Sequence, residues 1–459
     1  MAALDEIQTI VILMMENRSF DHMLGHLSME GLMPEVEGLK KRPDQEPGYG
    51  NFFDKEFYFP FLIEDEETLV FRDPPHDRRR VQMQLARSSS GRKFLMSGFV
   101  EAYVDYTQDR VEKFSPPMGY FNSNGAWMTS FLARQYCVCD HWFTPLPADT
   151  QPNRSMAFTG LTLIDETRSA LIPYRDHVFD WLTNRDIRWR VYHDGPPFFL
   201  LFGRFGELVG GRFQPISELA HDIQTEAPDR APQVIFIEPR YFDFFWSDQP
   251  PNCNHPPARV CNGELFLHRV YTALTSNPEK WARTLLIITY DEHGGFFDHV
   301  QPLRVKSPPP PSPPSLPPEK RARYTQGFET TGPRVPGLLI SPWVQPGKAF
   351  KGNLDHTSML QLLAEKFGSG PDDYSASVND RRAQEIRSLS EALADSPAVR
   401  PIPTQPPRSC PPMPSMKRKP QSPNERAFQQ AALELLDKEG PMQVGKKYPD
   451  LIGAPLTEP

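Results

Sequence analysis

Residues 9–17 read TIVILMMEN, and residues 284–292 read TLLIITYDE. Each is a short apolar run, rich in β-branched residues, that ends abruptly in polar side chains. Continuous apolar runs of this length are typical of strands that are buried on both faces, as in a parallel sheet. Three further runs of the same kind occupy residues 188–193, 233–238 and 337–341. Together the five runs predict a largely parallel central sheet.

Helical patterns lie between these apolar runs, notably over residues 123–136, 263–276 and 356–368. Because strands and helices alternate along the chain, we expect an α/β fold in which helices sandwich the sheet. The pair Cys137 and Cys139, in the sequence CVC, is expected to lie in a strand, since no second cysteine pair stands at zinc-finger spacing.

Two proline-rich stretches interrupt the alternation. Residues 306–319 are expected to form a polyproline-like excursion, and residues 401–423 a low-complexity linker. Beyond the linker, residues 424–440 predict one amphipathic helix that starts at an Asn cap, ends in Gly and docks back on the core. This pattern predicts a main domain over residues 1–400 and a helical appendage over residues 424–459.

The region 31–115 differs from the rest because it lacks strong periodicity and is rich in charge and Phe. We interpret it as an insertion that shapes the functional site. Two aromatic stretches, 196–205 and 241–248, have two interpretations. They form either part of the core or an apolar rim that receives acyl chains or a quaternary ammonium group.

The composition is that of an ordinary globular protein, with 39% apolar and 24% charged residues in a chain of 459. The 51 prolines are unusual, since proline normally makes up about 5% of a sequence. The formal net charge of −8 provides no overall basic field, so we expect no nucleic-acid partner. An anionic substrate would therefore need a local cation.

The N-terminal residues predict neither a secretory signal nor a membrane span. Acidic residues precede the first apolar run, no small-residue cleavage site follows it, and no stretch of 18 apolar residues occurs in the chain. We therefore expect a cytoplasmic protein, or one exported without a cleavable signal peptide, that lacks an integral membrane segment. The five cysteines favour reduced thiols, although Cys253 and Cys261 form an alternative disulfide pair.

The polar residues that end the first two apolar runs carry the most information about function. Glu16 and Asn17 follow one run, and Asp291 and Glu292 follow the other. In an open α/β sheet, ligands bind beyond the carboxyl ends of the strands, so both pairs would face one crevice. A divalent cation would offset the repulsion between the three carboxylates, and oxygen ligands suit such a metal. The alternative is that these acidic residues merely cap the following helices.

The segment PADTQPNRSMAFTG, residues 147–160, offers a candidate nucleophile. Thr150 stands two residues before Pro152, and proline favours the first turn of a helix. The hydroxyl of Thr150 would then lie at a helix N-terminus, where free amides favour phosphate. A neighbouring cation would lower the pKa of this hydroxyl enough for attack. Taken without its context, Thr150 could equally be a simple N-cap.

Histidines and arginines supply the remaining candidate groups. Four histidines lie in loops beside expected strand ends or at a helix start, where an imidazole could protonate a departing alkoxide: His255, His293, His299 and His356. Arg18 and Arg154 offer bidentate contacts to phosphate, or else surface ion pairs. The other histidines considered are interpreted as structural or surface residues: His22, His26, His76, His177, His221 and His268.

Five ordered motifs make the sequence resemble the bacterial phospholipase C and acid phosphatase family, within the alkaline-phosphatase-like superfamily. The motifs are ENRSFDHMLG (16–25), TQPNR (150–154), NHPP (254–257), DEHGGFFDHV (291–300) and DHTS (355–358). The resemblance implies a phosphoesterase domain over residues 1–400. Known phospholipase members commonly carry an N-terminal export signal, from which this chain departs. Longer haemolytic members carry C-terminal β-rich domains, whereas this chain has a proline-rich linker and a helix there.

The resemblance also implies roles for individual residues. The metal and nucleophile cluster would comprise Glu16, Asn17, Thr150, Asp291 and Glu292. The histidines around the phosphate would be His255, His299 and His356, and the substrate-binding residues Asn153, Arg154 and His293. The identity and number of the divalent metal ions stay open.

The expected reaction is hydrolysis of a phosphoric ester, of phospholipase C or acid phosphatase type. Thr150 would attack phosphorus to give a phosphothreonine, and water would hydrolyse that intermediate. The expected partner is a phosphate ester or a phospholipid, with at most a transient contact with a lipid surface. The alternative is a catalytically silent scaffold that uses residues 401–423 to recruit polyproline-binding domains. A sulfatase is disfavoured because no Cys-x-Pro-x-Arg segment occurs.

Overall fold

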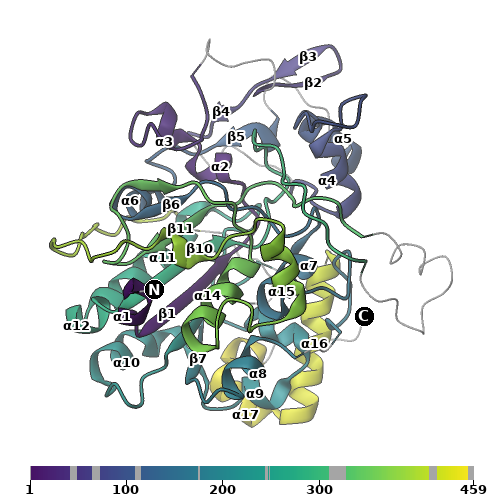
Figure 1. Cartoon of the computed structure of the whole chain (residues 1–459). Helices are drawn as coiled ribbons and strands as arrows, with labels where there is room; N and C mark the ends of the chain where they lie inside the picture. The colour runs from purple at the N-terminus through teal and green to yellow at the C-terminus, as the bar shows by residue number, and fades with distance from the viewer. Residues whose placement is uncertain are drawn as a thin grey trace.

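The computed structural model describes residues 2–41, 49–64, 73–108, 115–173, 176–242, 247, 249–309, 327–412 and 421–452. Its centre is an eight-stranded sheet with the strand order β12-β6-β11-β10-β1-β9-β7-β8 (Figure 1). In this order the strands are Lys348–Phe350, Cys137–Cys139, Gly337–Ile340, Thr284–Tyr290, Thr9–Met15, Val234–Glu238, Trp189–His193 and Phe213–Pro215. The five predicted apolar runs thus became β1, β7, β9, β10 and β11, and the pair of cysteines in CVC lies in β6.

The sheet is largely parallel, as predicted, but it contains one reversed strand. Five of its seven neighbouring pairs run parallel, whereas β11 is antiparallel to both β10 and β6. The direction of a strand is not encoded in its own apolar pattern, because a buried run looks the same in either direction. β1 lies between two parallel partners in the middle of the sheet, and every residue of β10 is buried. These two strands therefore form the centre of the hydrophobic core.

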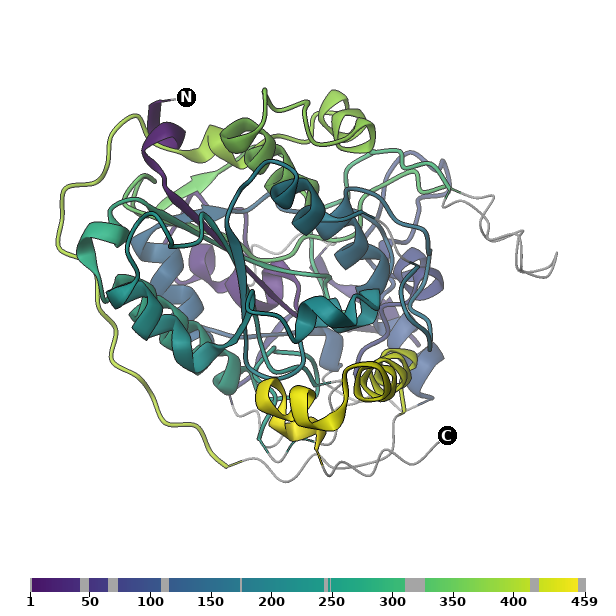
Figure 2. The same cartoon turned by 90° about the horizontal axis from the view of Figure 1, so that it is seen from below.

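Helices cover both faces of the sheet, as Figures 1 and 2 show, and the predicted α/β sandwich is confirmed. The helices on the sheet and around it are α1 (Ala2–Glu6), α2 (Phe20–Leu24), α3 (His26–Met29), α6 (Trp127–Gln135), α7 (Thr150–Thr159), α8 (Val178–Thr183), α9 (Phe205–Leu208), α10 (Leu219–Thr225), α11 (Val260–Thr275), α12 (Pro278–Trp281), α14 (Thr357–Phe367) and α15 (Ala376–Ala383). The short 3-10 helices are η2 (Pro116–Met118), η3 (Phe198–Phe202), η4 (Ile216–Glu218), η5 (Leu389–Ala392) and η6 (Pro449–Leu451). No helix in the described ranges combines the length and the apolar character that a bilayer crossing needs.

The region 31–115 forms a separate layer beyond the carboxyl ends of β1 and β10, at the top of Figure 1. It contributes β2 (Asn51–Phe53), β3 (Glu56–Tyr58), β4 (Phe61–Leu62), α4 (Arg78–Leu85) and α5 (Phe99–Thr107), while β5 (Gly119–Tyr120) pairs with β4. Its buried residues make a small second core around Phe99 and Phe297. This layer therefore packs directly on the segment that follows β10.

The proline-rich stretches fall partly outside the described residues. Of the predicted excursion 306–319, residues 310–319 lie outside them, as do residues 413–420 of the predicted linker. Of the two aromatic stretches, Phe198–Phe202 is fully buried, which agrees with the interpretation as core. In the second stretch, Tyr241 and Phe242 are buried, whereas residues 243–246 and 248 lie outside the description.

The C-terminal helix and the cysteines differ from expectation in detail. α16 (Pro423–Glu439) begins earlier than predicted, because Ser422 is its N-cap and forms a capping box with Glu425. α17 (Pro441–Lys447) follows directly. Cys261 forms a disulfide with Cys410, across a sequence separation of 149 residues, so the expectation of reduced thiols and the alternative pairing with Cys253 are both wrong. Chain segments that far apart in sequence meet only after folding.

Candidate active site

The carboxyl ends of β1 and β10 bring the two predicted acidic pairs together. Met15 pairs with Tyr290 in the parallel register, so the residues that follow these two leave the sheet at the same level. The backbone N–H of Asn17 donates to Asp291 Oδ1 at 3.1 Å, which ties the two chain segments directly. Asn17 has a φ of 56°, a left-handed conformation that asparagine tolerates better than most residues. The spatial convergence inferred from the sequence is therefore present.

A guanidinium group lies between two of the carboxylates. Arg154 Nε donates to Asp291 Oδ2 at 2.9 Å, and Arg154 Nη2 lies 3.4 Å from Glu16 Oε1, with all three side chains fully buried. Its remaining hydrogen bonds go to the hydroxyl of Tyr241 and to the carbonyl of Met15. The interpretation of Arg154 as a surface ion pair is therefore wrong, because its guanidinium forms a buried bridge between Glu16 and Asp291.

Thr150 is the first residue of α7, with Asp149 rather than Thr150 as the N-cap. Thr150 and Arg154 stand four residues apart and therefore share one face of the helix. Thr150 therefore lies one helical turn before Arg154, whose guanidinium binds Glu16 and Asp291. Thr150 is 3% exposed, so this turn is nearly closed to solvent.

The turn before Thr150 is held by a buried amide. Asn153 Oδ1 accepts from the N–H of Leu146, and Asn153 Nδ2 donates to the carbonyls of Ala148 and Asp149. These bonds use both Oδ1 and Nδ2 of Asn153, which was expected to bind substrate. Asn153 therefore fixes the backbone that presents Thr150.

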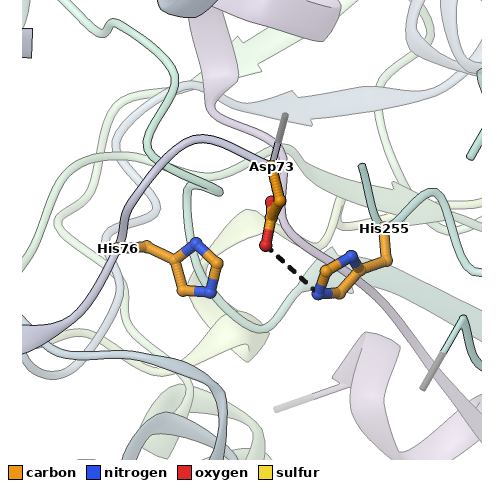
Figure 3. A group of neighbouring side chains, drawn as sticks. All are labelled: Asp73, His76 and His255. Atoms are coloured by element: carbon orange, nitrogen blue, oxygen red, sulfur yellow. Dashed lines mark ion pairs between the residues drawn. The ribbon is translucent and has the colours of Figure 1, made fainter. Parts of the chain in front are cut away.

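Two residues that the sequence analysis did not select lie beside the acidic pairs. Asp73, His76 and His255 point toward one another, and their ligand atoms lie within 4.8 Å of each other (Figure 3). His76 Nε2 is 3.3 Å from Asn17 Nδ2 and 3.8 Å from Glu292 Oε1. The group formed by Asp73, His76 and His255 therefore adjoins the predicted metal residues.

The imidazole of His255 has a defined orientation. Its Nδ1–H donates to the carbonyl of Pro256 at 2.6 Å, and its Nε2 lies 4.0 Å from Asp73 Oδ2. The ring stacks on Phe242 at a centroid distance of 5.1 Å. His255 thus presents Nε2 toward Asp73.

The carboxylates of this region are destabilised by burial and by each other. Burial raises the pKa of Glu292 to about 8, and the charge of Asp291 adds to the rise. Burial and the charge of Glu292 likewise raise the pKa of both Asp73 and Asp149 to about 7. Burial opposes the charge of His76, yet three carboxylates (Glu292, Asp73 and Asp149) raise its pKa to about 10. The site thus has an excess of acidic groups over cations.

Buried acceptors show that the site suits a cation. Among the described residues, Asn17 Oδ1 and Glu292 Oε1 are buried acceptors that have no hydrogen-bond partner. Such atoms are costly unless a donor or a metal ion satisfies them. Carboxylate, amide and imidazole donors together fit a divalent metal of intermediate hardness. The residues that could hold it are Glu16, Asn17, Asp291 and Glu292, with Asp73 and His76 beside them, and Arg154 contacts one oxygen of Glu16 and one of Asp291.

His356 lies directly beneath the cluster but has both ring nitrogens engaged. Trp142 Nε1 can only donate, so His356 Nδ1 accepts from it at 3.1 Å. His356 Nε2 then carries the hydrogen and donates to the carbonyl of Asp291 at 2.7 Å. Burial lowers the pKa of His356 to about 4, which keeps the ring neutral. His356 thus fixes the backbone of Asp291 and has no nitrogen left for a phosphate.

His293 connects the metal segment to the region 31–115. Gln84 Nε2 donates to the carbonyl of Pro75, so Gln84 Oε1 accepts from His293 Nε2 at 2.8 Å. Burial lowers the pKa of His293 to about 3. The neutral ring is held by Gln84, and its unprotonated Nδ1 faces Glu292 Oε2 at 3.3 Å.

His299 belongs to a different group of buried charges. Its Nδ1 donates to Asp21 Oδ2 at 2.6 Å, and Arg334 joins Asp21 to Asp298. The resemblance implied that His299 lies around the phosphate and that His293 binds substrate, and both stand in the motif DEHGGFFDHV. The turn at Gly294 and Gly295 separates them, since both glycines have positive φ.

The loop with Asp73 and His76 packs against Gly295, and the backbone of Asn17 packs against Gly294. A Cβ on Gly294 would stand 2.0 Å from the carbonyl oxygen of Asn17, and one on Gly295 would stand 2.6 Å from that of Pro75. The Gly-Gly pair was thus the one sequence signal that another backbone approaches the metal segment. His76 itself, expected to be structural or at the surface, stands in DPPHD without any periodic pattern.

Arg18 is also engaged internally. Its Nε donates to the carbonyl of Asn254 at 2.7 Å, its Nη2 to that of Ala258 at 3.1 Å, and its Nη1 lies 2.9 Å from His22 Nε2. Arg18 is 1% exposed, which removes it from the surface. It therefore fixes the NHPP loop that presents His255.

Comparisons with known proteins agree with these motifs. A model of the phosphoesterase family matches residues 7–369. The non-specific phospholipase C6 of Arabidopsis thaliana is 32% identical over 355 residues, which are 74% of this chain and 62% of that protein. The non-hemolytic phospholipase C of Burkholderia pseudomallei is 26% identical over 415 residues, 79% of this chain and 55% of that protein. The chain therefore spans 55% to 62% of the length of these two relatives.

A solved structure of a protein in the alkaline phosphatase superfamily from Vibrio parahaemolyticus also matches, at 12% identity and a TM-score of 0.30. The match covers 58% of this chain and 64% of that chain. The family model, in contrast, extends from before β1 to beyond the end of α14. Since it covers most of the sequence, this chain belongs to the phosphoesterase family.

Proposed function

We propose that this chain hydrolyses phosphoric esters, with Thr150 as the nucleophile and a divalent cation bound beside it. The observation that carries the proposal is the position of Thr150 at the start of α7. One turn further on, Arg154 binds both Glu16 and Asp291, and the buried acceptors Asn17 Oδ1 and Glu292 Oε1 belong to the residues that directly follow these two in the chain. A hydroxyl at a helix N-terminus beside such a cluster has the setting that phosphoryl transfer requires.

The proposed metal ligands are Glu16, Asn17, Thr150, Asp291 and Glu292, and His76 and Asp73 extend this set. A bound divalent ion would lower the pKa of the threonine hydroxyl and offset the negative charge of the carboxylates. The carboxylates of Glu16 and Asp291 are held by Arg154 in fixed orientations. Such a fixed arrangement costs no reorganisation when substrate arrives.

In the proposed reaction, the hydroxyl of Thr150 gives its proton to solvent, Thr150 Oγ1 attacks phosphorus in line, and the P–O bond to the alcohol breaks on the opposite side. The positive end of the α7 helix dipole stabilises the charge that develops on the phosphoryl oxygens. The amides of Gln151 and Asn153 donate within the protein, to Thr167 Oγ1 and to the carbonyl of Asp149, and Pro152 has no N–H. His255 Nε2 donates the proton to the departing alkoxide, because Pro256 holds the other ring nitrogen. Water then hydrolyses the phosphothreonine.

His356, His293 and Asn153 act as positioning residues in this proposal, since their hydrogen bonds are made within the protein. His299 contributes through the charge group that fixes Asp21 and Arg334. The reacting groups are thereby reduced to a smaller set than the sequence motifs suggested.

The proposed substrates are phosphodiesters of phospholipid head groups, because the relatives described above are named as phospholipases C. Contact with a lipid surface would be transient. A comparison of phosphatidylcholine in micelles with bis-p-nitrophenyl phosphate tests this class. Equal or better kcat/KM on the soluble diester would contradict the lipid preference and leave the diesterase chemistry intact.

The nucleophile is tested with Thr150→Ala and Thr150→Ser, using Thr159→Ala at the other end of α7 as the matched control. We expect Thr150→Ala to lose at least 10³-fold in kcat with an unchanged unfolding midpoint, a loss of about 4 kcal/mol of transition-state stabilisation. Thr150→Ser and Thr159→Ala should retain turnover. Acid-quenched protein should carry phosphate on Thr150 alone, and phosphate on another residue would refute the assignment.

A further inference from the structure

We propose that α16 is part of the catalytic apparatus, and that Asn424 and Phe428 on it are positioning residues for the nucleophile helix α7. The family match ends at residue 369, so the helix lies outside the part of the chain that the family shares. In Figure 2 the described part of the preceding arm, up to residue 412, runs along one side of the molecule, and α16 and α17 appear in yellow. The inference rests on the proposed function, because it concerns the position of Thr150.

The first connection joins α16 to the residue next to the nucleophile. Gln151 Nε2 donates to Asn424 Oδ1 at 3.0 Å and to the carbonyl of Arg168 at 3.0 Å. Gln151 Oε1 accepts from the N–H of Arg168 at 3.1 Å. Gln151 is fully buried and Asn424 is 6% exposed, so water does not readily replace this bond. The first turn of α7 is therefore tied to the first turn of α16.

The second connection reaches Arg154 through an aromatic contact. Phe428 is fully buried, and its ring lies 5.8 Å from that of Tyr241, centroid to centroid. The hydroxyl of Tyr241 donates to Glu238 Oε2 at 2.7 Å and accepts from Arg154 Nη1 at 2.9 Å. Phe428 therefore supports the phenol that holds the guanidinium.

The two connections act at the two ends of the first turn of α7. Asn424 acts next to Thr150, and Phe428 acts on Arg154, which binds Asp291 at 2.9 Å. A shift of the hydroxyl relative to the carboxylates would disturb the near-attack geometry, in which small displacements reduce the rate strongly. The helix α16 thus controls the distance between the nucleophile and the acidic cluster.

The docking of α16 is specific enough for this role. The capping box of Ser422 and Glu425 defines where the helix starts, and a buried apolar face that includes Ala431 and Leu435 anchors the rest of it. Beyond α17, Tyr448 donates its hydroxyl hydrogen to the carbonyl of Leu208 at 2.9 Å. The capping box defines the direction of Asn424 and Phe428 in the first turns of α16, whereas Leu435 anchors the later turns.

The test compares Asn424→Ala and Phe428→Ala with Leu435→Ala, a buried residue of the same helix that lies further along it. We expect the first two to lower kcat for bis-p-nitrophenyl phosphate at least tenfold at unchanged KM. Leu435→Ala should lower the unfolding midpoint but keep kcat within twofold. Asn424→Asp retains the acceptor oxygen for Gln151 and should restore most of the rate.

Hydrogen exchange provides a readout that does not depend on turnover. The amides of residues 150–154 should exchange at least tenfold faster in Asn424→Ala and Phe428→Ala, and at the wild-type rate in Leu435→Ala. An inactive wild-type protein with this exchange pattern would refute the proposed function but support the positioning role. Unchanged exchange and kcat in the first two variants would overturn the inference, as would an equal loss of kcat in Leu435→Ala.

Discussion

Replacing Arg154 by Met is the most direct test of how the acidic cluster is held together. The substitution keeps most of the side-chain volume and removes only the charge that faces Glu16 and Asp291. The two carboxylate oxygens lie 3.4 and 2.9 Å from the guanidinium nitrogens, and all three side chains are fully buried. At an effective dielectric constant of about 20, each of these pairs attracts by about 5 kcal/mol before the cost of burial.

The net effect is smaller, because the ions also lose hydration when they are buried. Removal of one partner from a buried ion pair typically costs about 3–5 kcal/mol, since an uncompensated charge is left behind. We therefore expect the metal-free Arg154→Met protein to lose about 3–5 kcal/mol of unfolding free energy at neutral pH. Arg283→Met removes a half-exposed pair with Glu6 and should cost less than about 1 kcal/mol.

The assay is urea unfolding in EDTA and again with added Mn²⁺ or Zn²⁺. Because the variant leaves two carboxylates without their cation, the metal should stabilise Arg154→Met more than the wild type. A variant that unfolds in EDTA at the wild-type midpoint would refute this account of the cluster. An equal response of both proteins to metal would show that the ion binds away from Glu16 and Asp291.

Three further predictions concern pH, a glycine and the disulfide. Burial lowers the pKa of His26, His177 and His193, so below pH 6.5 the unfolded chain binds protons at these groups that the folded protein does not bind. The urea midpoint of His193→Phe, relative to the wild type, should therefore be higher at pH 4 than at pH 6.5, and an equal difference at both pH values would contradict this role. Gly294→Ala places a Cβ 2.0 Å from the carbonyl of Asn17, so metal affinity by calorimetry should drop at least tenfold, whereas Gly211→Ala, in open space, should bind normally. Cys410→Ser removes a crosslink between residues that are 149 apart in sequence, and it should lower the unfolding free energy by about 2–5 kcal/mol in urea. A wild-type protein that keeps its unfolding free energy when it is reduced would argue against the disulfide.

The apolar runs were enough to predict the sheet, because a strand buried on both faces needs a continuous apolar sequence whatever surrounds it. The runs at 9–15 and 284–290 became β1 and β10 with the predicted bounds. Their parallel pairing then placed Glu16 and Asp291 side by side, which follows from local sequence and from the geometry of parallel strands. The reversed direction of β11 did not follow, since its apolar pattern is the same in both directions.

The partners of the site residues could not be predicted in the same way. Arg154 stands 137 residues before Asp291 in the chain, and Trp142 stands 214 residues before His356. No local pattern encodes such distant contacts, so the neutral, fully bonded state of His356 and the bridge formed by Arg154 became apparent only in the folded chain. The same holds for His76, which the loop at residues 73–77 carries to Glu292.

The sequence alone determined the sheet, the acidic residues at its edge and the hydroxyl at the start of α7, because strand burial, strand ends and helix starts are properties of neighbouring residues. Only the tertiary structure decided which side chains are engaged within the protein and which face the crevice. Hydrogen bonds, ion pairs and the Cys261–Cys410 disulfide join residues whose proximity is created by packing. Neighbouring residues in the sequence therefore predict where the site lies, whereas the role of each site residue depends on partners that are distant in the sequence.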